Sequence, residues 1–225
     1  MILPDSSART SVLGRIGVTS RSSFEEYSPL SEIAALILAA DRGIDLPEAT
    51  ALQTVRGRSL LASALERVRA WPVDRIVVVL GADEELVGSR HDMGDCTVIV
   101  DPEWEEGTAS PLRAGLDHLL RQGGVTGAVV IDVGQLASDA ETVGRLLDVA
   151  DEQPSWAVVT KYRYKWDAPY LIGIDIWPQL LGREGDSQLD KILLAHPDWV
   201  QELRLDEGRP PRVSTREELL ILNRS

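Results

Sequence analysis

The chain has 225 residues, 44% of them hydrophobic and 26% charged, and 36 acidic residues against 23 basic ones give a net charge of −13. This is the composition of a globular protein with one domain, and its acidity argues against DNA, RNA or an anionic membrane as a partner held by charge. No apolar run is long enough to cross a membrane. The single cysteine, Cys96, excludes an internal disulfide, and we expect it to be a small buried side chain.

The first thirty residues differ in composition from the rest of the chain. Residues 1–30 are rich in Ser, contain several Arg and Gly residues and lack a sustained hydrophobic period. They contain no continuous apolar stretch of the kind found in secretory signals, so we expect a cytoplasmic protein. We interpret them as an N-terminal arm that packs on the body or on a second subunit, or else as a disordered tail. Residues 31–225 then form the folded domain.

From residue 31 onward, short apolar runs alternate with helical patterns. Runs rich in Val and Ile predict strands at 34–40, 75–81, 97–100, 127–133 and 155–160. A period near 3.6 predicts helices at 59–70, 110–121 and 141–152, the second with Ser110 as its N-cap and Pro111 at its first helical position. Strands that are apolar throughout indicate a sheet covered on both faces. The alternation predicts a single Rossmann-like α/β domain of three layers with a mostly parallel central sheet.

The last third of the chain is less regular. It predicts strands at 170–173 and 200–205 and helices at 189–194 and 215–222, the last of which begins with Ser214 and Thr215 as caps. In a parallel sheet, ligands bind beyond the carboxyl ends of the strands. We therefore expect a site at the turns that follow Ala40, Gly81, Val100 and Val133.

The most specific stretch runs from Asp101 to Leu116 and reads DPEWEEGTASPLRAGL. It resembles the pattern Asn-Pro-x-Trp-x-x-Gly-x-x-Ser-Ser-Leu-Arg-Ala-Gly-Leu of the MobA-like nucleotidyltransferases. Further segments are similar in order and spacing, namely LILAA at 36–40, RGRSLL at 56–61, VVVLG at 77–81 and LIG at 171–173. The chain thus resembles this family from Ala34 to its C-terminus, and within it the molybdenum cofactor cytidylyltransferases. The resemblance implies the nucleotidyltransferase type of the α/β fold, which is glycosyltransferase-A-like.

The resemblance also implies a chemistry. Family members transfer a nucleotidyl group from a nucleoside triphosphate to a phosphorylated acceptor, such as a molybdopterin-type cofactor or a phosphosugar, and release pyrophosphate. Catalysis then consists of positioning and charge neutralisation. A loop glycine, arginine and lysine hold the triphosphate, and aspartates after the fourth strand and near the C-terminus hold Mg²⁺.

The sequence departs from the family pattern at these positions. The glycine, arginine, second glycine and lysine of the phosphate loop fall on Asp41, Asp45, Pro47 and Thr50. The aspartate after the fourth strand falls on Gly134, and the C-terminal Asp-x-Asp-Thr reads Arg212 to Thr215. A carboxylate in place of a cation repels a triphosphate by on the order of a few kcal/mol.

These departures lead to two main hypotheses about function. The first is a degenerate family member without standard nucleotidyl transfer, which acts as a binding or regulatory protein or carries reworked chemistry in the old nucleotide cleft. The alternative is an active Mg²⁺-dependent nucleotidyltransferase, in which Asp132 is the catalytic metal ligand and Arg42, Gly43, Ser110 and Arg113 bind the nucleotide phosphates. A third hypothesis is a structural partner protein that uses the arm and an acidic face. The expected partners are a nucleotide or other small anion, a second protein, or a second copy of the chain.

Each of these site residues also has a structural interpretation. Asp132 lies two residues before Gly134, on the same face of a strand, and either binds a metal or accepts a hydrogen bond from a neighbouring loop. Arg42 either contacts phosphate or pairs with the adjacent aspartates. Ser110 and Arg113 either hold an anion or cap the helix and pair with Asp101 or Glu106.

Overall fold

The computed structural model describes residues 30–136, 138–153, 155–182 and 188–224, so the predicted N-terminal arm lies outside the described residues except for Leu30. The body is built on a seven-stranded sheet with the order β5-β4-β1-β6-β8-β7-β9. The strands are β1 (Ile33–Ala39), β4 (Arg75–Leu80), β5 (Thr97–Val100), β6 (Gly127–Asp132), β7 (Ala157–Tyr162), β8 (Lys165–Gly173) and β9 (Val200–Leu205). β8 is antiparallel to both of its neighbours and the other strands run in one direction. The mostly parallel α/β sheet predicted from the sequence is confirmed.

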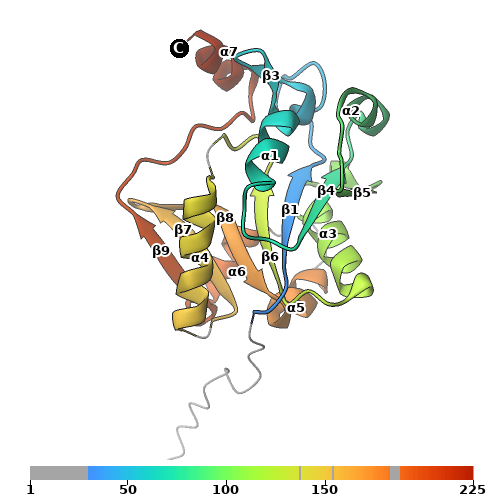
Figure 1. The fold of residues 1–225 in the computed structure, drawn as a ribbon. Helices are drawn as coiled ribbons and strands as arrows, with labels where there is room; N and C mark the ends of the chain where they lie inside the picture. Colours follow the sequence, from blue (N-terminus) through green and yellow to red (C-terminus); the bar gives the residue numbers. More distant parts are fainter. Residues whose placement is uncertain (1–29, 137, 154, 183–187, 225) are drawn as a thin grey trace, which may run out of the picture.

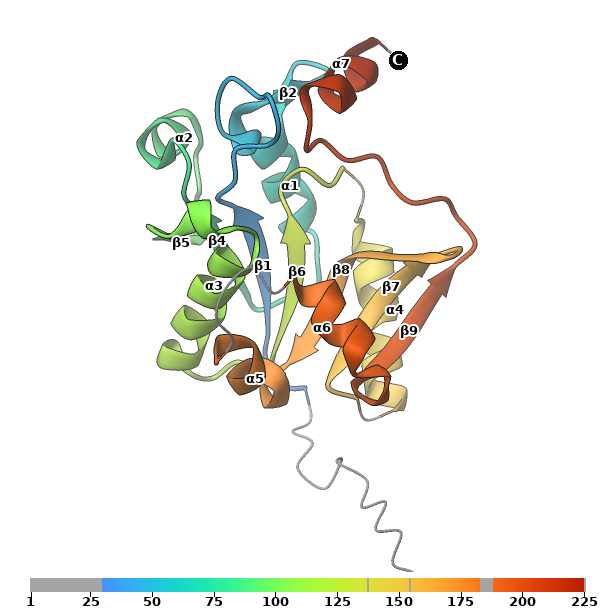
Figure 2. The same ribbon diagram turned by 180° about the vertical axis from the view of Figure 1, so that it is seen from behind.

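Helices cover both faces of this sheet. α1 (Leu60–Val68) and α4 (Ala140–Glu152) lie on the face seen in Figure 1. α3 (Ala109–Gln122), α5 (Trp177–Leu181) and α6 (Leu189–Ala195) lie on the face seen in Figure 2. The three layers account for two buried apolar clusters, one on each side of the sheet. No helix among the described residues is long and apolar enough to span a membrane.

The central strand shows why these residues fold in this way. Every residue of β1 except Leu38 is buried, and successive side chains enter opposite clusters. Ala35 and Ile37 pack on the side of α1, whereas Ala34 and Leu36 pack on the side of α3. The small alanines let the helices come close to the sheet, and the larger residues fill the space between them. This packing fixes the direction of β1 and therefore the position of the turn at Asp41 that follows it.

Two details of the sequence prediction were wrong. β5 is apolar but is not covered on both faces, because it is the edge strand and Val98 and Val100 are exposed. Ser110 is not the N-cap of α3: the helix starts at Ala109 after Thr108, which places Ser110 second and Pro111 third. The reason is local, since Ser110 N–H donates to the carbonyl of Gly107 (3.3 Å) and so continues the preceding turn into the helix. A proline remains tolerated there because the first-turn N–H groups have no helical partner.

Three short elements surround the carboxyl ends of the strands. α2 (Glu84–Arg90) follows β4, and α7 (Arg216–Arg224) closes the chain. A small hairpin of β2 (Thr54–Val55) and β3 (Arg58–Ser59) leads into α1, with Arg56 and Gly57 at positive φ in its turn. In Figure 1 these elements sit above the tips of β1, β4 and β6. They frame the place where a ligand of a parallel sheet is expected.

Candidate functional site

The site lies where the carboxyl ends of β1 and β6 meet. Asp41 follows β1 and Asp132 ends β6, its neighbour in the sheet. Burial first, and then the charge of Asp132, raise the pKa of Asp41 to about 6, although a hydrogen bond from Thr50 opposes the rise. Two carboxyl groups therefore share a position where the family chemistry calls for a phosphate-binding glycine. Their mutual repulsion disfavours an additional anion beside them.

Thr50 holds the loop after β1 in a closed form. Its Oγ1 donates to Oδ2 of Asp41 and accepts from the N–H of Gly43, both at 3.0 Å. Its own N–H donates to the carbonyl of Asp41 at 3.0 Å. Thr50 stands at the position that the resemblance assigns to a lysine, so a side chain that would neutralise phosphate is replaced by one that ties the loop to Asp41.

Arg42 points away from this carboxylate pair. Its Nη2 lies 2.6 Å from Oδ1 of Asp83, in the turn after β4. Asp83 also accepts from the N–H of Ala49 at 2.7 Å, so it binds both ends of the loop. Arg42 thus pairs with an aspartate of the next strand along the sheet and not with its sequence neighbours Asp41 and Asp45, because the loop turns back over β4.

The C-terminal segment 211–216 crosses the top of the site. The N–H of Ile44 donates to the carbonyl of Ser214 (2.8 Å), and the N–H of Val213 donates to the carbonyl of Gly134 (2.8 Å). A Cβ on Gly43 would lie 2.5 Å from that Ser214 oxygen, and one on Gly134 would overlap the carbonyl oxygen of Val213. Position 134, where the family has a metal-binding aspartate, therefore has no room for a side chain.

Asp132 meets an arginine of the same segment. Its Oδ1 accepts from the N–H of Gly134 at 2.7 Å, and its Oδ2 lies 3.5 Å from Nη2 of Arg212. Burial raises the pKa of Asp132 and the guanidinium of Arg212 lowers it, with a net rise. The hydrogen bond to the neighbouring turn is the structural interpretation made from the sequence.

The described residues do not fit a resident Mg²⁺. No three His, Cys, Asp or Glu side chains in the described part of the chain are grouped so as to hold a metal ion. Arg212, which stands where the resemblance places a metal aspartate, directs its positive charge at Asp132. A cation that is part of the chain thus occupies the neighbourhood of the one carboxylate proposed as a metal ligand.

A cavity of about 230 Å³ opens beside Asp132, between β6, β8 and α6. Its wall combines aromatic and charged groups, among them Trp166, Tyr170, Asp167, Arg209 and Arg212. Arg209 and Asp167 form an ion pair, and the Nε of Arg212 is buried without a hydrogen-bond partner. The cavity can hold a small molecule that offers an acceptor to Arg212 and a flat surface to the aromatic rings.

Comparison with known proteins identifies the family of this arrangement. A family model described as the MobA-like NTP transferase domain matches residues 35–200. The chain belongs to the MobA-like NTP transferase family. The family assignment made from the sequence is thereby confirmed.

Two curated relatives carry different names, one of a bifunctional protein and one of an oxidoreductase. The bifunctional protein GlmU of Trichlorobacter lovleyi is 33% identical over 177 residues, which cover 77% of this chain and 36% of that protein. The nicotine blue oxidoreductase of Paenarthrobacter nicotinovorans is 30% identical over 122 residues, which cover 51% of this chain and 55% of that protein. The chain spans only about a quarter of the length of other GlmU relatives, which the alignment covers to 25%.

Solved structures agree with the MobA-like fold. Rv0371c from Mycobacterium tuberculosis superposes with a TM-score of 0.77 at 24% identity, over 87% of this chain and 99% of that one. A manganese complex of the same protein superposes with a TM-score of 0.75 at 22% identity, over 87% and 100%. At these identities the likeness concerns the fold, and it confirms the nucleotidyltransferase type of the sheet.

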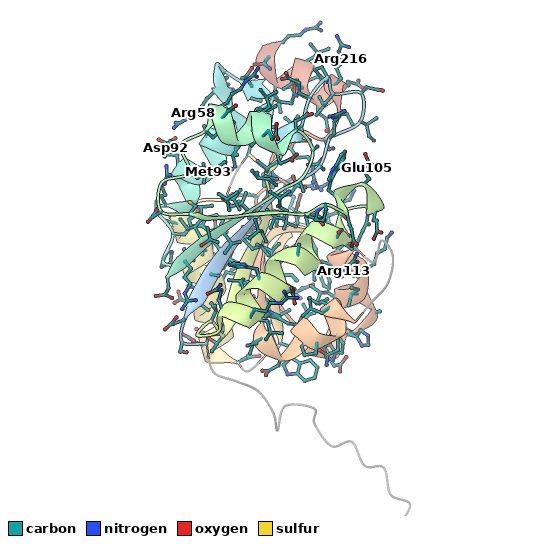
Figure 3. All side chains as sticks on the ribbon, turned by 90° about the vertical axis from the view of Figure 1, so that its right-hand side faces the viewer. Arg58, Asp92, Met93, Glu105, Arg113 and Arg216 are labelled. Carbon is teal, nitrogen blue, oxygen red and sulfur yellow. The ribbon has the colours of Figure 1, made fainter. Side chains whose placement is uncertain are left out.

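The two residues proposed on α3 lie to one side of the carboxylate pair. Ser110 is buried, and Arg113 lies 3.6 Å from Glu106 (Nη2 to Oε2), as one of the two sequence interpretations predicted. Figure 3 shows Arg113 on α3, below the turn that carries Glu105. Thr108 and Leu112 of this region line the cavity, whereas Ser110 and Arg113 do not. The structure therefore brings Asp132 together with Gly43 through the C-terminal segment, but separates both from Arg113.

Sequence reasoning missed Asp167, Tyr170 and Arg209, and it regarded Arg212 only as a lost carboxylate. The sequence did contain a signal for these residues. Arg209 and Arg212 flank two prolines, which stiffen the backbone between them, and two such close arginines are unusual in a chain with a net charge of −13. Burial raises the pKa of Tyr170 and so keeps its hydroxyl protonated at the cavity wall.

Proposed function

We propose that this MobA-like chain is a degenerate member of its family, which binds a ligand or a protein partner in the old nucleotide cleft and does not transfer nucleotidyl groups by the metal-dependent route. One observation carries the proposal: Arg212 points at Asp132 at 3.5 Å, where the family's chemistry needs a metal between carboxylates. A guanidinium at that position repels Mg²⁺ and already offsets part of the charge of Asp132.

The closed loop after β1 supports the same view. The N–H groups of Gly43, Ile44, Ala49 and Thr50 all donate to protein acceptors. A triphosphate bound there would have to break several of these hydrogen bonds, and each buried donor left unpaired costs about 1–3 kcal/mol. It would also face Asp41 at close range. Binding of a triphosphate in the family's manner is therefore disfavoured by both geometry and charge.

The cavity beside Arg212 suggests what replaces the nucleotide. We infer a small anionic ligand that is flat in part, held by Arg212 and packed on Trp166 and Tyr170, in a cytoplasmic protein that binds neither nucleic acid nor membrane. A protein partner or a second copy of the chain is the other occupant to be tested. A relative named for an oxidoreductase supports the idea that the MobA-like frame serves more than one chemistry.

Thermal titration tests the proposal directly. CTP, GTP, ATP and UTP are each titrated with and without Mg²⁺, and the melting temperature and pyrophosphate release are followed. We expect no Mg²⁺-dependent rise and no pyrophosphate. A matched variant, Arg212→Asp with Asp41→Gly, replaces the guanidinium by a carboxylate and removes the carboxylate at position 41, and we expect it to acquire a Mn²⁺-dependent rise in melting temperature that the natural chain lacks. A Mg²⁺-dependent shift of the natural chain with one nucleotide would refute the proposal.

The alternative of an active Mg²⁺-dependent nucleotidyltransferase rests on the placement of Asp132. This carboxylate ends β6 and borders the cavity, where a metal-bound phosphate of a substrate would arrive. In that case Arg212 would move to the phosphate when substrate binds, and Arg42, Gly43, Ser110 and Arg113 would have to turn toward the nucleotide. Asp132→Ala would then abolish turnover, whereas Asp139→Ala, at the exposed cap of α4, would leave it unchanged.

A further inference from the structure

The edge of the sheet at β5 is open, at the side of the molecule away from the cavity beside Asp132. β5 is the last strand in the order and pairs with β4 from Thr97 to Val100. Val98 and Val100 are 40% and 51% exposed and, being two residues apart, share one face. The strand contains neither a charged residue nor a proline, which are the features that usually protect an edge. Its outer backbone groups are thus available to another strand.

A cavity of about 630 Å³ lies at the foot of this edge. It exists because β5 begins opposite Val77, so the first two residues of β4, Arg75 and Ile76, extend below it. The end of α1 and the end of α3 supply the rest of the wall, including Trp71 and His118. The edge and the cavity together form a continuous open surface.

The chain enters the fold beside this cavity. Arg75 donates from Nη2 to Oε2 of Glu32 (3.0 Å), and Asp74 accepts at Oδ2 from the N–H of Ile33 (2.8 Å). Arg75 and Asp74 are both part of the cavity wall. The 29 residues that precede the described structure therefore join it at the mouth of the cavity, and strand spacing puts the open position beside β5 only about 14 Å from β1.

We propose that residues 15–21, Arg-Ile-Gly-Val-Thr-Ser-Arg, add an eighth strand to the open edge of β5 in the same chain. Ile16 and Val18 alternate with polar or small residues, as a strand with one apolar face requires. They match the exposed pair Val98 and Val100. Arginines stand at both ends of the segment, and the stretch 92–106 around β5 has six acidic residues and no basic one. Asp92 and Glu105 are seen on either side of this edge in Figure 3.

The connection fixes the direction of the added strand. β5 runs away from the foot of the sheet, as β1 does. Residues 22–29 can span about 26 Å when extended, enough to cross from the foot of β5 to β1 but nearly taut if they also had to return along the strand. The segment therefore runs antiparallel to β5, and its connection passes the cavity with Phe24 and Tyr27 available to fill it.

One register satisfies both the apolar face and the charges. With Val18 opposite Val98, Ile16 lies opposite Val100 and Ser20 lies opposite Cys96. The same register sets Arg15 opposite Asp101 and Arg21 opposite Asp95. Opposite residues of an antiparallel pair have their Cβ atoms about 4.5–5.5 Å apart, so the apolar pairs and the contact of Arg21 with Asp95 can form together, whereas Asp101 is only 3% exposed and does not offer its carboxylate to Arg15.

A second copy of β5 is a weaker occupant of this edge. Two such strands would bring together two stretches of six carboxylates, and the body from residue 30 onward carries the whole net charge of −13, because residues 1–29 contain three arginines and three acidic residues. Like charges at an interface disfavour the pairing. The arm of the same chain supplies the opposite charge and has the shorter path.

The single native cysteine gives a direct test. Ser20→Cys is introduced into the full-length chain and disulfide formation with Cys96 is followed under mild oxidation by mass spectrometry and non-reducing electrophoresis. We expect a disulfide within one chain, at least ten times faster than in Thr19→Cys, whose side chain falls on the other face. Arg15→Glu with Arg21→Glu, added to Ser20→Cys, should slow it. Equal rates for Ser20→Cys and Thr19→Cys, or a disulfide only between two chains, would overturn the proposal.

Hydrogen exchange gives a readout that needs no cysteine. In the natural chain the amides of Val98 and Val100, which point away from β4, should exchange slowly, and in Ile16→Asp with Val18→Asp they should exchange at least ten times faster. Ser11→Asp, outside the proposed strand, serves as the control. Fast exchange of these amides in the natural chain would also overturn the proposal.

Discussion

Among single residues, Asp41 carries a charge that the fold tolerates poorly. Its pKa in the folded state is about 6 against an ordinary 3.8. Between these values the folded chain holds a proton that the unfolded chain has lost, so stability falls as the pH rises from about 4 to 6 and stays lowered above it. The difference corresponds to about 3 kcal/mol at most.

Asp41→Asn should therefore stabilise the protein at pH 8 and change little at pH 4. The amide keeps an oxygen for the hydroxyl of Thr50 and removes the charge beside Asp132. Asp45→Asn is the matched control, because Asp45 is exposed in the same loop and its positive φ suits asparagine. Urea unfolding at both pH values measures the effect. An equal gain at pH 4 and pH 8 would show that burial of the charge is not its cause.

Gly134 is required by contact and not by backbone conformation. Its φ is not in the left-handed region, but a Cβ would overlap the carbonyl oxygen of Val213. Gly134→Ala should cost about 1–3 kcal/mol, because the C-terminal segment must move away from the turn after β6. Gly144→Ala, in α4 where a Cβ meets open space, should stabilise by about 0.5–1 kcal/mol. A lower melting temperature for Gly134→Ala and a higher one for Gly144→Ala would confirm this interpretation, and two decreases of equal size would contradict it.

At the scale of elements, the start of α7 holds the segment that covers the site. Glu218 accepts at Oε2 from the N–H groups of Ser214 (2.8 Å) and Thr215 (3.1 Å), and the Oγ1 of Thr215 accepts from the N–H of Glu218 (3.2 Å). This is the reciprocal capping predicted from the sequence. Burial raises the pKa of Glu218, but these hydrogen bonds outweigh it and lower the pKa, so the stability they give is lost as the pH falls below the ordinary value of 4.5.

Glu218→Ala should therefore loosen the C-terminal segment 211–216 that covers the carboxyl ends of the strands. We expect a loss of about 1 kcal/mol and faster amide exchange at Ile44 and Val213, which the segment protects. Glu217→Ala removes the same charge from the first turn but is exposed, so it reports the helix dipole alone. If both variants exchange alike, the cap does not hold the segment in place.

The elements with a strong hydrophobic pattern could be predicted from the sequence, whereas features that depend on an element's position in the fold could not. The apolar runs gave β1, β4 and β6 to within about one residue, because a buried parallel strand must be apolar on both faces. The same pattern at 97–100 could not show that β5 is an edge, since neighbours in a sheet are set by the whole topology. α2 was missed because Val87 is its only buried residue and so leaves no period to read.

For the site, the turns could be predicted but their partners could not. Asp132 was found because the end of a parallel strand is a place defined by the sequence. The contact of Asp132 with Arg212 joins residues eighty positions apart. Neither the hydrophobic period nor local propensity predicts such a contact. It depends on the path of the C-terminal segment over the sheet, which only the structure shows.

At the scale of the whole molecule, the two proposals concern opposite ends of one sheet. The cleft lies at the carboxyl ends of β1 and β6, whereas the arm is proposed to bind along β5 and at the foot of β4. Residues of the two regions share no hydrogen bond or ion pair among the contacts described above. Substitutions in the two regions should therefore add in their effect on stability. A failure of one proposal leaves the other open to its own test.

The net charge of −13 predicts that salt affects the stability of the entire folded body. Raising NaCl from about 10 mM to about 150 mM shortens the Debye length from about 30 Å to about 8 Å and screens the mutual repulsion of the carboxylates. The melting temperature should rise, because surface ion pairs lose less than this repulsion costs. Choline chloride at equal ionic strength should give the same rise, since screening does not depend on the cation. MgCl₂ at that ionic strength should add little, because Arg212 already faces Asp132. A distinctly larger rise with Mg²⁺, abolished by Asp132→Asn, would instead reveal a metal site and favour the active enzyme.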